Sequence, residues 1–228
     1  MLQGIIDNPA PLATARSQRW SMLAVLLTGV SALLALVAVC GWMNSTQIAD
    51  LGSVQQMRSH GVYADWDQGS VIVLVRHAER CDRSQGACLN DPAGITVAGS
   101  QVAGSVGNGL RRLGLADVDL LASPEVRTRQ TAHYLFGKEI ATEDWLARCN
   151  ADFADAALAR KRPGHNLVLV THSGCIDQLE RSLGVAGDQR TPGYASALLV
   201  SLGGNGKAKV LGQMNAGQWR KLDTGKKT

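Results

Sequence analysis

The chain has 228 residues and a mass of 24.2 kDa, with 45% hydrophobic, 18% charged and 4% aromatic residues and a formal net charge of +4 at pH 7. This length suits one domain of ordinary size, typically about 100–200 residues, together with an appendage. The charged fraction is below the ~25% typical of soluble domains, which argues against a disordered protein and against one that coats nucleic acid, and excludes a solvated tail protein.

An apolar segment lies near the N-terminus. Between Arg19 and Asp50 there is no Asp, Glu, Lys or Arg, and residues 21–43 consist largely of Leu, Ala and Val. About 20 apolar residues in a helix span a hydrocarbon core of about 30 Å, so we predict a transmembrane anchor over 20–43. Because Arg16 and Arg19 precede this anchor, the positive-inside bias places residues 1–19 in the cytoplasm and the bulk of the chain in the periplasm.

Three alternatives stay open for this segment. A cleaved secretory signal has an apolar region of about 7–15 residues that ends in an Ala-x-Ala-like site, and the run here is longer and lacks that site. Lipidation at Cys40 would require a small residue where Val39 stands. The segment could also be a buried helix of a soluble core.

Four cysteines follow the apolar segment, namely Cys81, Cys88, Cys149 and Cys175. An even number in an exported domain indicates two disulfides. Because Cys81 and Cys88 enclose a short loop, we favour a Cys81–Cys88 pair and a Cys149–Cys175 pair. A zinc site that combines His172 with cysteines is the alternative, although Cys-x6-Cys is not the spacing of a ligand pair.

The rest of the chain alternates strand-like and helix-like segments. Residues 44–68 are polar and mixed, which predicts a linker before a domain over 69–228. Runs of β-branched residues and Leu predict buried strands at 71–75, 118–122 and 166–170. Helices are predicted at 96–113, 126–136, 151–161 and 175–183, and a glycine-rich turn predicts a hairpin of strands at 195–202 and 207–214. This alternation predicts an α/β fold with a mostly parallel central sheet covered on both faces.

Polar clusters follow the three predicted parallel strands, at 76–80 (Arg-His-Ala-Glu-Arg), 123–131 and 171–174 (Thr-His-Ser-Gly). Ligands of such sheets bind beyond the carboxyl ends of the strands, so we expect two histidines and at least two arginines to converge there. Guanidinium groups bind phosphoryl oxygens bidentately, and a neutral imidazole nitrogen can attack phosphorus. The clusters therefore predict phosphoryl transfer to histidine, whereas an isolated histidine would more simply be a partly buried structural side chain.

These motifs resemble those of the histidine phosphatase superfamily, also called the phosphoglycerate mutase-like family. Residues 76–79 resemble its Arg-His-Gly-Glu signature, 123–132 its Ser-Pro-x-x-Arg-x-x-Gln-Thr-Ala motif and 171–174 its second-histidine motif. The segment 94–103 resembles the start of the family's Leu-Thr-x-x-Gly helix. Within the superfamily, residues 73–84 with the nearby Cys88 are most similar to the lipopolysaccharide core heptose(II)-phosphate phosphatase group.

The resemblance implies a three-layer phosphoglycerate mutase-like fold and assigns roles to residues of the clusters. His77 would be the nucleophile that becomes phosphohistidine, and His172 would stabilise the transferring group opposite it. Arg76 and Arg127 would hold the phosphoryl oxygens, and Arg80 is an added candidate for the same pocket or else a surface arginine. The resemblance implies no metal and no cofactor.

The general acid is where the sequence departs from the family. Arg148 stands where the mutase-like branch has Glu, and Ser173 stands where the phytase-like branch has Asp. We predict Asp152, which opens the helix after Cys149, although a solvated carboxylate at a helix N-terminus is an equally simple interpretation. The remaining candidates are Glu143, Asp144 and Asp155.

The expected function is that of a single-pass inner-membrane phosphomonoesterase whose periplasmic domain acts on a phosphorylated small molecule or a lipopolysaccharide core sugar. Nucleic acid is not an expected partner, because the modest positive charge is that of a site for one phosphate. The alternatives are a phosphohistidine or broad-specificity phosphatase and a non-catalytic phosphate-binding envelope protein.

Overall fold

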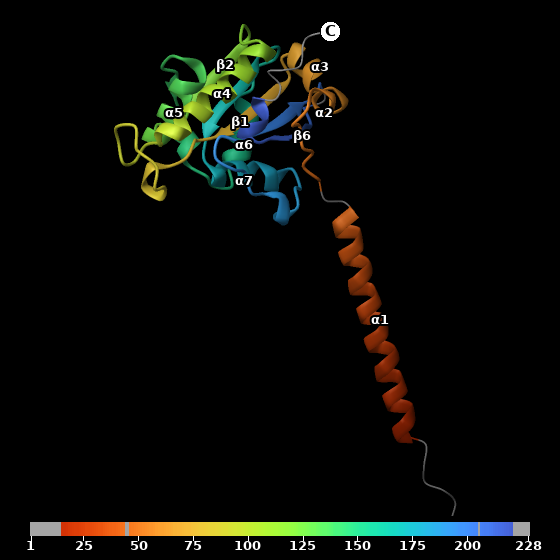
Figure 1. The fold of residues 1–228 in the computed structure, drawn as a ribbon. Helices are drawn as coiled ribbons and strands as arrows, with labels where there is room; N and C mark the ends of the chain where they lie inside the picture. Colours follow the sequence, from red (N-terminus) through yellow and green to blue (C-terminus); the bar gives the residue numbers. More distant parts are fainter. Residues whose placement is uncertain (1–14, 44–45, 205, 221–228) are drawn as a thin grey trace, which may run out of the picture. The chain divides into compact units, whose positions relative to one another are not determined.

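The computed structural model describes residues 15–43, 46–204 and 206–220 and divides the chain into two units, with the boundary after Ser45. The N-terminal unit contains the helix α1 (Ala15–Met43), of 29 residues, which covers the predicted anchor (Figure 1). The predicted membrane span itself is not supported: among the described residues, no helix is long and apolar enough to cross a membrane. Of the predicted cytoplasmic segment 1–19, positions 1–14 lie outside the described residues.

The second unit is built on a six-stranded sheet with the strand order β3-β2-β4-β1-β5-β6. Its strands are β1 (Val71–Arg76), β2 (Val118–Ala122), β3 (Ala141–Thr142), β4 (Asn166–Thr171), β5 (Ala197–Leu202) and β6 (Ala208–Met214). The strands β3, β2, β4 and β1 pair in parallel, whereas β5 is antiparallel to both β1 and β6. The prediction of an α/β domain with a mostly parallel sheet is confirmed.

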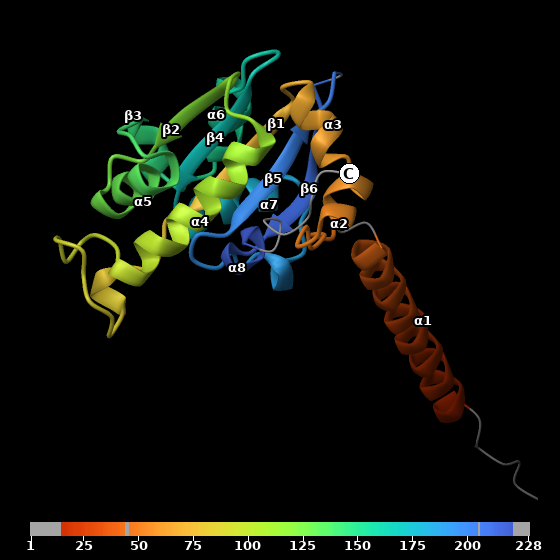
Figure 2. The ribbon, with the colours of Figure 1, turned by 45° about the horizontal axis from the view of Figure 1, so that its top comes forward.

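Helices cover both faces of this sheet and make three layers (Figure 2). One face packs against α2 (Val54–Ser59), α3 (Val62–Asp67), α4 (Val97–Leu113), α5 (Val126–Phe136) and α8 (Ala216–Trp219). The other packs against α6 (Phe153–Arg160), α7 (Ser173–Ser182) and the 3₁₀ turn η2 (Asp144–Ala147). Side chains alternate between the faces of a strand, so Val73 and Val75 belong to the first core cluster and Ile72 and Leu74 to the second.

The glycines of α4 weaken its helix propensity but allow it to pack closely against neighbouring elements. A Cβ atom on Gly107 would lie 1.9 Å from the carbonyl oxygen of Leu135 in α5, and one on Gly109 would lie 2.1 Å from the ring of Trp219. The helix starts at Thr96, whose side chain accepts a 2.9 Å hydrogen bond from the backbone N–H of Gly99. This cap and the close packing offset the cost of the glycines, roughly 1 kcal/mol each relative to alanine.

Residues 46–68 are part of the α/β domain, so the linker predicted over 44–68 is wrong for this stretch. Met57, Val62 and Trp66 are buried in the core, and the indole Nε1 of Trp66 donates a 3.1 Å hydrogen bond to the carbonyl oxygen of Gly114. The helices α2 and α3 have six residues each. Such short helices contain too few apolar positions for a periodic pattern to show in the sequence.

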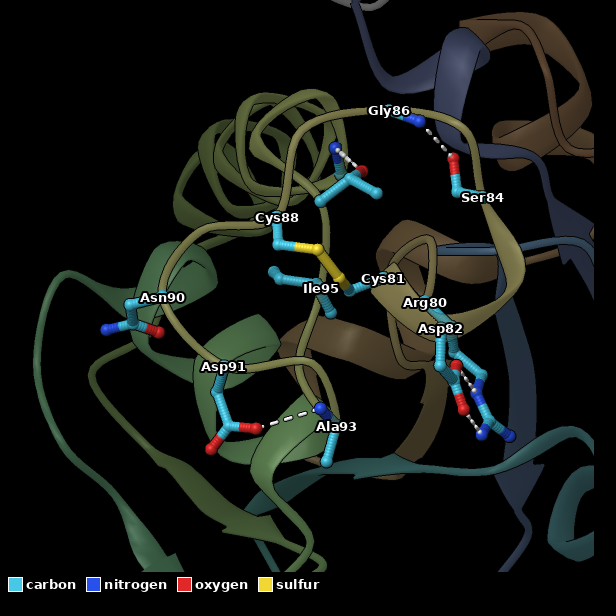
Figure 3. The surroundings of a disulfide bond; sticks show 12 residues. Arg80, Cys81, Asp82, Ser84, Gly86, Cys88, Asn90, Asp91, Ala93 and Ile95 are labelled. Atoms are coloured by element: carbon cyan, nitrogen blue, oxygen red, sulfur yellow. Dashed lines mark hydrogen bonds and ion pairs between the residues drawn. A yellow bond between two sulfur atoms is a disulfide. The ribbon is translucent and has the colours of Figure 1, made fainter.

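Two disulfides, Cys81–Cys88 and Cys149–Cys175, join the cysteine pairs that the sequence favours. The first closes the loop that follows β1 (Figure 3), which also contains the 3₁₀ turn η1 (Cys81–Arg83). The second links residue 149, just after η2, to the first turn of α7. The predicted disulfide pairing is therefore confirmed, and both bridges lie close in sequence to a histidine of the predicted site.

Candidate active site

The two histidines lie at the carboxyl ends of neighbouring parallel strands. Arg76 at the end of β1 pairs with Thr171 at the end of β4, and the backbone N–H of His77 donates a 2.9 Å hydrogen bond to the carbonyl oxygen of Thr171. The centroids of the His77 and His172 rings are 5.5 Å apart, with an interplanar angle of 61°. Both side chains are buried at this sheet edge, with relative exposures of 4% and 9%.

The imidazole of His77 is held in one tautomer. Its Nδ1 lies 2.8 Å from the carbonyl oxygen of Ala78, which can only accept a hydrogen bond, so Nδ1 carries the proton and Nε2 keeps a lone pair. Burial, assisted by the positive charges of Arg127 and Arg76, lowers the pKa of His77 from 6.5 to about 3. The ring is thus neutral at pH 7, with Nε2 available as a nucleophile.

His172 is oriented by two side chains from the segment after β2. The Nη2 atom of Arg127 lies 3.3 Å from its Nδ1, and because guanidinium only donates, this nitrogen accepts. The other ring nitrogen, Nε2, then donates across 2.9 Å to the hydroxyl oxygen of Ser123. Burial and the charge of Arg127 lower the pKa of His172 to about 4, so this ring is also neutral at pH 7.

Arg76 and Arg127 each have a buried donor to offer to a ligand. The Nη1 of Arg76 donates to the carbonyl oxygen of Pro192 at 2.7 Å, and the Nη1 of Arg127 is 2.9 Å from a carboxylate oxygen of Glu125. The Nε atoms of both arginines are buried without a hydrogen-bond partner among the described residues. An unmade buried donor costs roughly 1–3 kcal/mol, and an oxyanion is the kind of acceptor that such a donor lacks.

Arg80 lies at the rim of the site. Its guanidinium is bonded to Asp82 through Nε, at 2.7 Å, and through Nη2 (Figure 3). The charge of Arg80 is among the causes that lower the pKa of His172, so it acts on the site electrostatically. To bind a phosphoryl group directly, Arg80 would have to exchange part of its contact with Asp82.

Asp152 is exposed at the start of α6, and within the described part of the chain no recorded hydrogen bond or ion pair joins it to the site histidines or arginines. Glu143, one of the alternatives, lies 4.0 Å from Arg160. The described residues also contain no group of three or more His, Cys, Asp or Glu side chains that could hold a metal ion. The role of Asp152 as the acid stays a prediction.

Two residues of the site were missed in the sequence. Glu125, which contacts Arg127, belongs to the cluster after β2 and could have been found by the rule that located the histidines. The ring of Tyr194 lies 5.7 Å from that of His77. Since β5 is antiparallel to β1, the residues before β5 lie at the same sheet edge as those after β1, and that was the available signal for Tyr194.

No family model matches the chain. A solved structure of the protein histidine phosphatase SixA with tungstate superposes with a TM-score of 0.52 and 16% identity, covering 64% of this chain and 97% of that chain. The chain has the histidine phosphatase fold.

Curated relatives agree with the motif resemblance. Two are called lipopolysaccharide core heptose(II)-phosphate phosphatase, one from Escherichia coli O1:K1 and one from strain E24377A of O139:H28, and each is 40% identical over 117 or 118 residues. The match covers 50% of this chain and 58% of the relatives' length. The predicted resemblance to this group is confirmed, and the relatives' name agrees with the predicted enzyme class.

The low pKa values of the two histidines predict an acid-sensitive fold. Below about pH 6.5 the unfolded chain takes up protons at His77 and His172 that the folded chain excludes until about pH 3–4, so the free energy of unfolding falls as the pH falls. We expect wild type to lose stability relative to His77→Asn by on the order of 1 kcal/mol per pH unit between pH 6 and pH 4. Urea unfolding of both proteins at pH 7, 6, 5 and 4 measures this.

The free energy of unfolding must be compared between the two proteins at each pH, because the titration of Glu180 changes stability in the opposite direction to that of the histidines. Burial raises the pKa of Glu180 to about 7, so this carboxyl stabilises the fold at low pH and loses that effect as the pH rises. The difference between wild type and His77→Asn cancels this contribution. A difference that stays constant from pH 7 to pH 4 would show that His77 titrates normally.

Proposed function

We propose that this chain is a phosphomonoesterase that forms a phosphohistidine at His77. The observation that carries the proposal is the buried imidazole of His77, whose proton is held on Nδ1 by the Ala78 carbonyl while Nε2 remains unprotonated beside Arg76 and Arg127. A neutral imidazole supplies the electron pair, and the arginines supply the charge that a phosphoryl group requires.

Two displacements at phosphorus complete the reaction. The Nε2 of His77 attacks, the bond from phosphorus to the alcohol oxygen breaks, and the alcohol leaves with a proton from an acid. Water then attacks the phosphohistidine, the P–N bond breaks, and phosphate and free His77 are released. In both steps Arg76 and Arg127 bind the phosphoryl oxygens. His172 stabilises the transferring group by turning its Nε2 proton from the hydroxyl of Ser123 to a phosphoryl oxygen.

The relatives support a proposal for the substrate class. Their name describes a phosphatase of a lipopolysaccharide core heptose phosphate, and the matched region is 40% identical. We therefore propose a phosphorylated sugar of the lipopolysaccharide core as the substrate. The match covers only 58% of the relatives' length. The substrate is therefore tested directly, by measuring phosphate release from a heptose phosphate.

The nucleophile is tested by His77→Ala in the full chain. We expect phosphate release from p-nitrophenyl phosphate and from a heptose phosphate to fall on the order of 10³-fold or more, because the nucleophile is gone. Wild type incubated with labelled substrate should carry acid-labile phosphate on His77. His133→Ala, which changes an exposed histidine of α5, is the matched control and should keep full activity.

Equal phosphate release by wild type and His77→Ala would refute the nucleophile. Tight phosphate binding by wild type with no phosphohistidine and no turnover would instead indicate the competing function, a non-catalytic phosphate-binding protein. This competitor is considered because Arg148 and Ser173 stand where related branches of the family have the acid.

Two carboxylates compete for the role of the acid, Asp152 from the sequence and Glu125 from its contact with Arg127. General acids contribute typically 10²–10⁴-fold, and only when the leaving group needs a proton. The variant that removes the acid, Asp152→Asn or Glu125→Gln, should therefore lose activity on an alkyl phosphate and keep it on p-nitrophenyl phosphate. If both variants treat the two substrates alike, neither carboxylate is the acid.

We propose that the domain works in the periplasm, and the two disulfides support an oxidising compartment. Attachment to the inner membrane through residues 20–43 stays a prediction. Alkaline phosphatase fused to the C-terminus should be active in cells, since that reporter requires export. A fusion that is inactive while a cytoplasmic fluorescent reporter is bright would contradict the assignment.

A further inference from the structure

The segment that leads into β5 is bonded to the end of β1 at several points. The backbone N–H of Arg76 donates to the carbonyl oxygen of Ser196 at 3.0 Å, and that of Ala195 donates to the carbonyl oxygen of His77 at 3.3 Å. The side chain of Arg76 adds the 2.7 Å bond to Pro192. Residues 192–196 are therefore fastened to the proposed nucleophile and to its neighbouring arginine.

Tyr194 lies at the tip of this segment and contacts both site residues. The guanidinium carbon of Arg76 is 4.0 Å from the centroid of the tyrosine ring, in the geometry of a cation–π contact. The ring is tilted by 45° relative to His77. Such a contact contributes more when the cation is removed from water, and burial is the main cause that lowers the pKa of Arg76.

The backbone that presents the ring is strained. Ala195 has a φ of 53°, and among the described residues no other amino acid except glycine has a positive φ. The N–H of Ser196 donates to the carbonyl oxygen of Gly193 at 3.2 Å, which closes a turn with Tyr194 and Ala195 at its centre. A left-handed alanine costs roughly 1–2 kcal/mol, and such strain is concentrated at functional sites.

The contacts of Arg76 hold the guanidinium and leave its Nε donor unpaired among the described residues. Pro192 accepts from Nη1, the ring of Tyr194 covers one face of the guanidinium, and Nε is buried with no partner in the described part of the chain. A hydrogen bond at one nitrogen and a ring against one face restrict the orientation of the guanidinium. Its other N–H donors are then held in a fixed orientation for a phosphoryl oxygen.

We propose that Tyr194 is a positioning residue, whose ring holds the guanidinium of Arg76 in the orientation that binds the phosphoryl group and is itself set by the left-handed turn at Ala195. This inference rests on the proposed function for the identity of the ligand. It assigns the effect to the aromatic face, and the phenol hydroxyl has no part in it.

Inorganic phosphate is the probe, and its dissociation constant is measured by calorimetry on the full chain. Tyr194→Leu should weaken phosphate binding about 5- to 30-fold, the range of a partly desolvated cation–π contact. Tyr194→Phe keeps the ring and should bind within about twofold of wild type. Tyr134→Leu, at an exposed tyrosine of α5, is the matched control and should not change the constant.

A double-variant cycle separates positioning from a general effect on the fold. In an Arg76→Gln background the ring has no guanidinium to hold, so adding Tyr194→Leu should change the dissociation constant less than twofold. If Tyr194→Leu fails to fold by circular dichroism, Tyr194→Met takes its place as a ring-free variant of similar bulk.

Three results would overturn the inference: unchanged phosphate affinity in Tyr194→Leu, an equal loss in Tyr194→Phe, or an undiminished loss in the Arg76→Gln background. Because the readout is binding, it does not depend on turnover. Full activity of His77→Ala would refute the proposed mechanism and leave this result intact, whereas failure of wild type to bind phosphate would refute both.

Discussion

The parallel pairing of β1 with β4 is the constraint on which the site depends. Its register places Arg76, the last residue of β1, opposite Thr171, the last residue of β4, and a histidine follows each of them. A shift by one residue would send the side chains of either strand to the opposite face of the sheet and separate the two rings. Since both strands are buried and packed on both sides, the hydrophobic cores that hold the register also hold the distance between the imidazoles.

The same burial sets the chemistry of the site. Imidazoles beside arginines would repel a proton even in water, and removal from solvent makes the protonated form still less favourable. Burial also lowers the pKa of Arg76, but a guanidinium starts from a value so high that it keeps its charge. The result is a pocket that carries positive charge on its guanidinium groups and unprotonated nitrogens on its histidines, which is the division that attack on a phosphoryl group requires.

The sequence predicted the parts of this protein that depend on local patterns. The buried runs gave β1, β2 and β4, the range 126–136 matches α5, and cysteine spacing gave the disulfides. It failed for residues 46–68, where two six-residue helices carry isolated core side chains without a period. The two-residue strand β3 is likewise too short to leave a pattern.

In the site, too, the residues that depend on local sequence patterns could be predicted, and those that depend on the assembled sheet could not. His77 and His172 follow their strands directly, and Arg127 lies in the first turn of the helix after β2. Strand prediction, together with the rule that ligands bind beyond the carboxyl ends of parallel strands, therefore brings all three to one place. Tyr194 reaches the site only because β5 runs antiparallel to β1, and that orientation is a property of the assembled sheet. The prediction of Asp152 as the acid rests on its closeness in sequence to Cys149, and the Cys149–Cys175 disulfide by itself fixes the cysteine and not a carboxylate three residues beyond it. A bond constrains the backbone it joins, and the direction of a side chain one turn away is decided by its own packing.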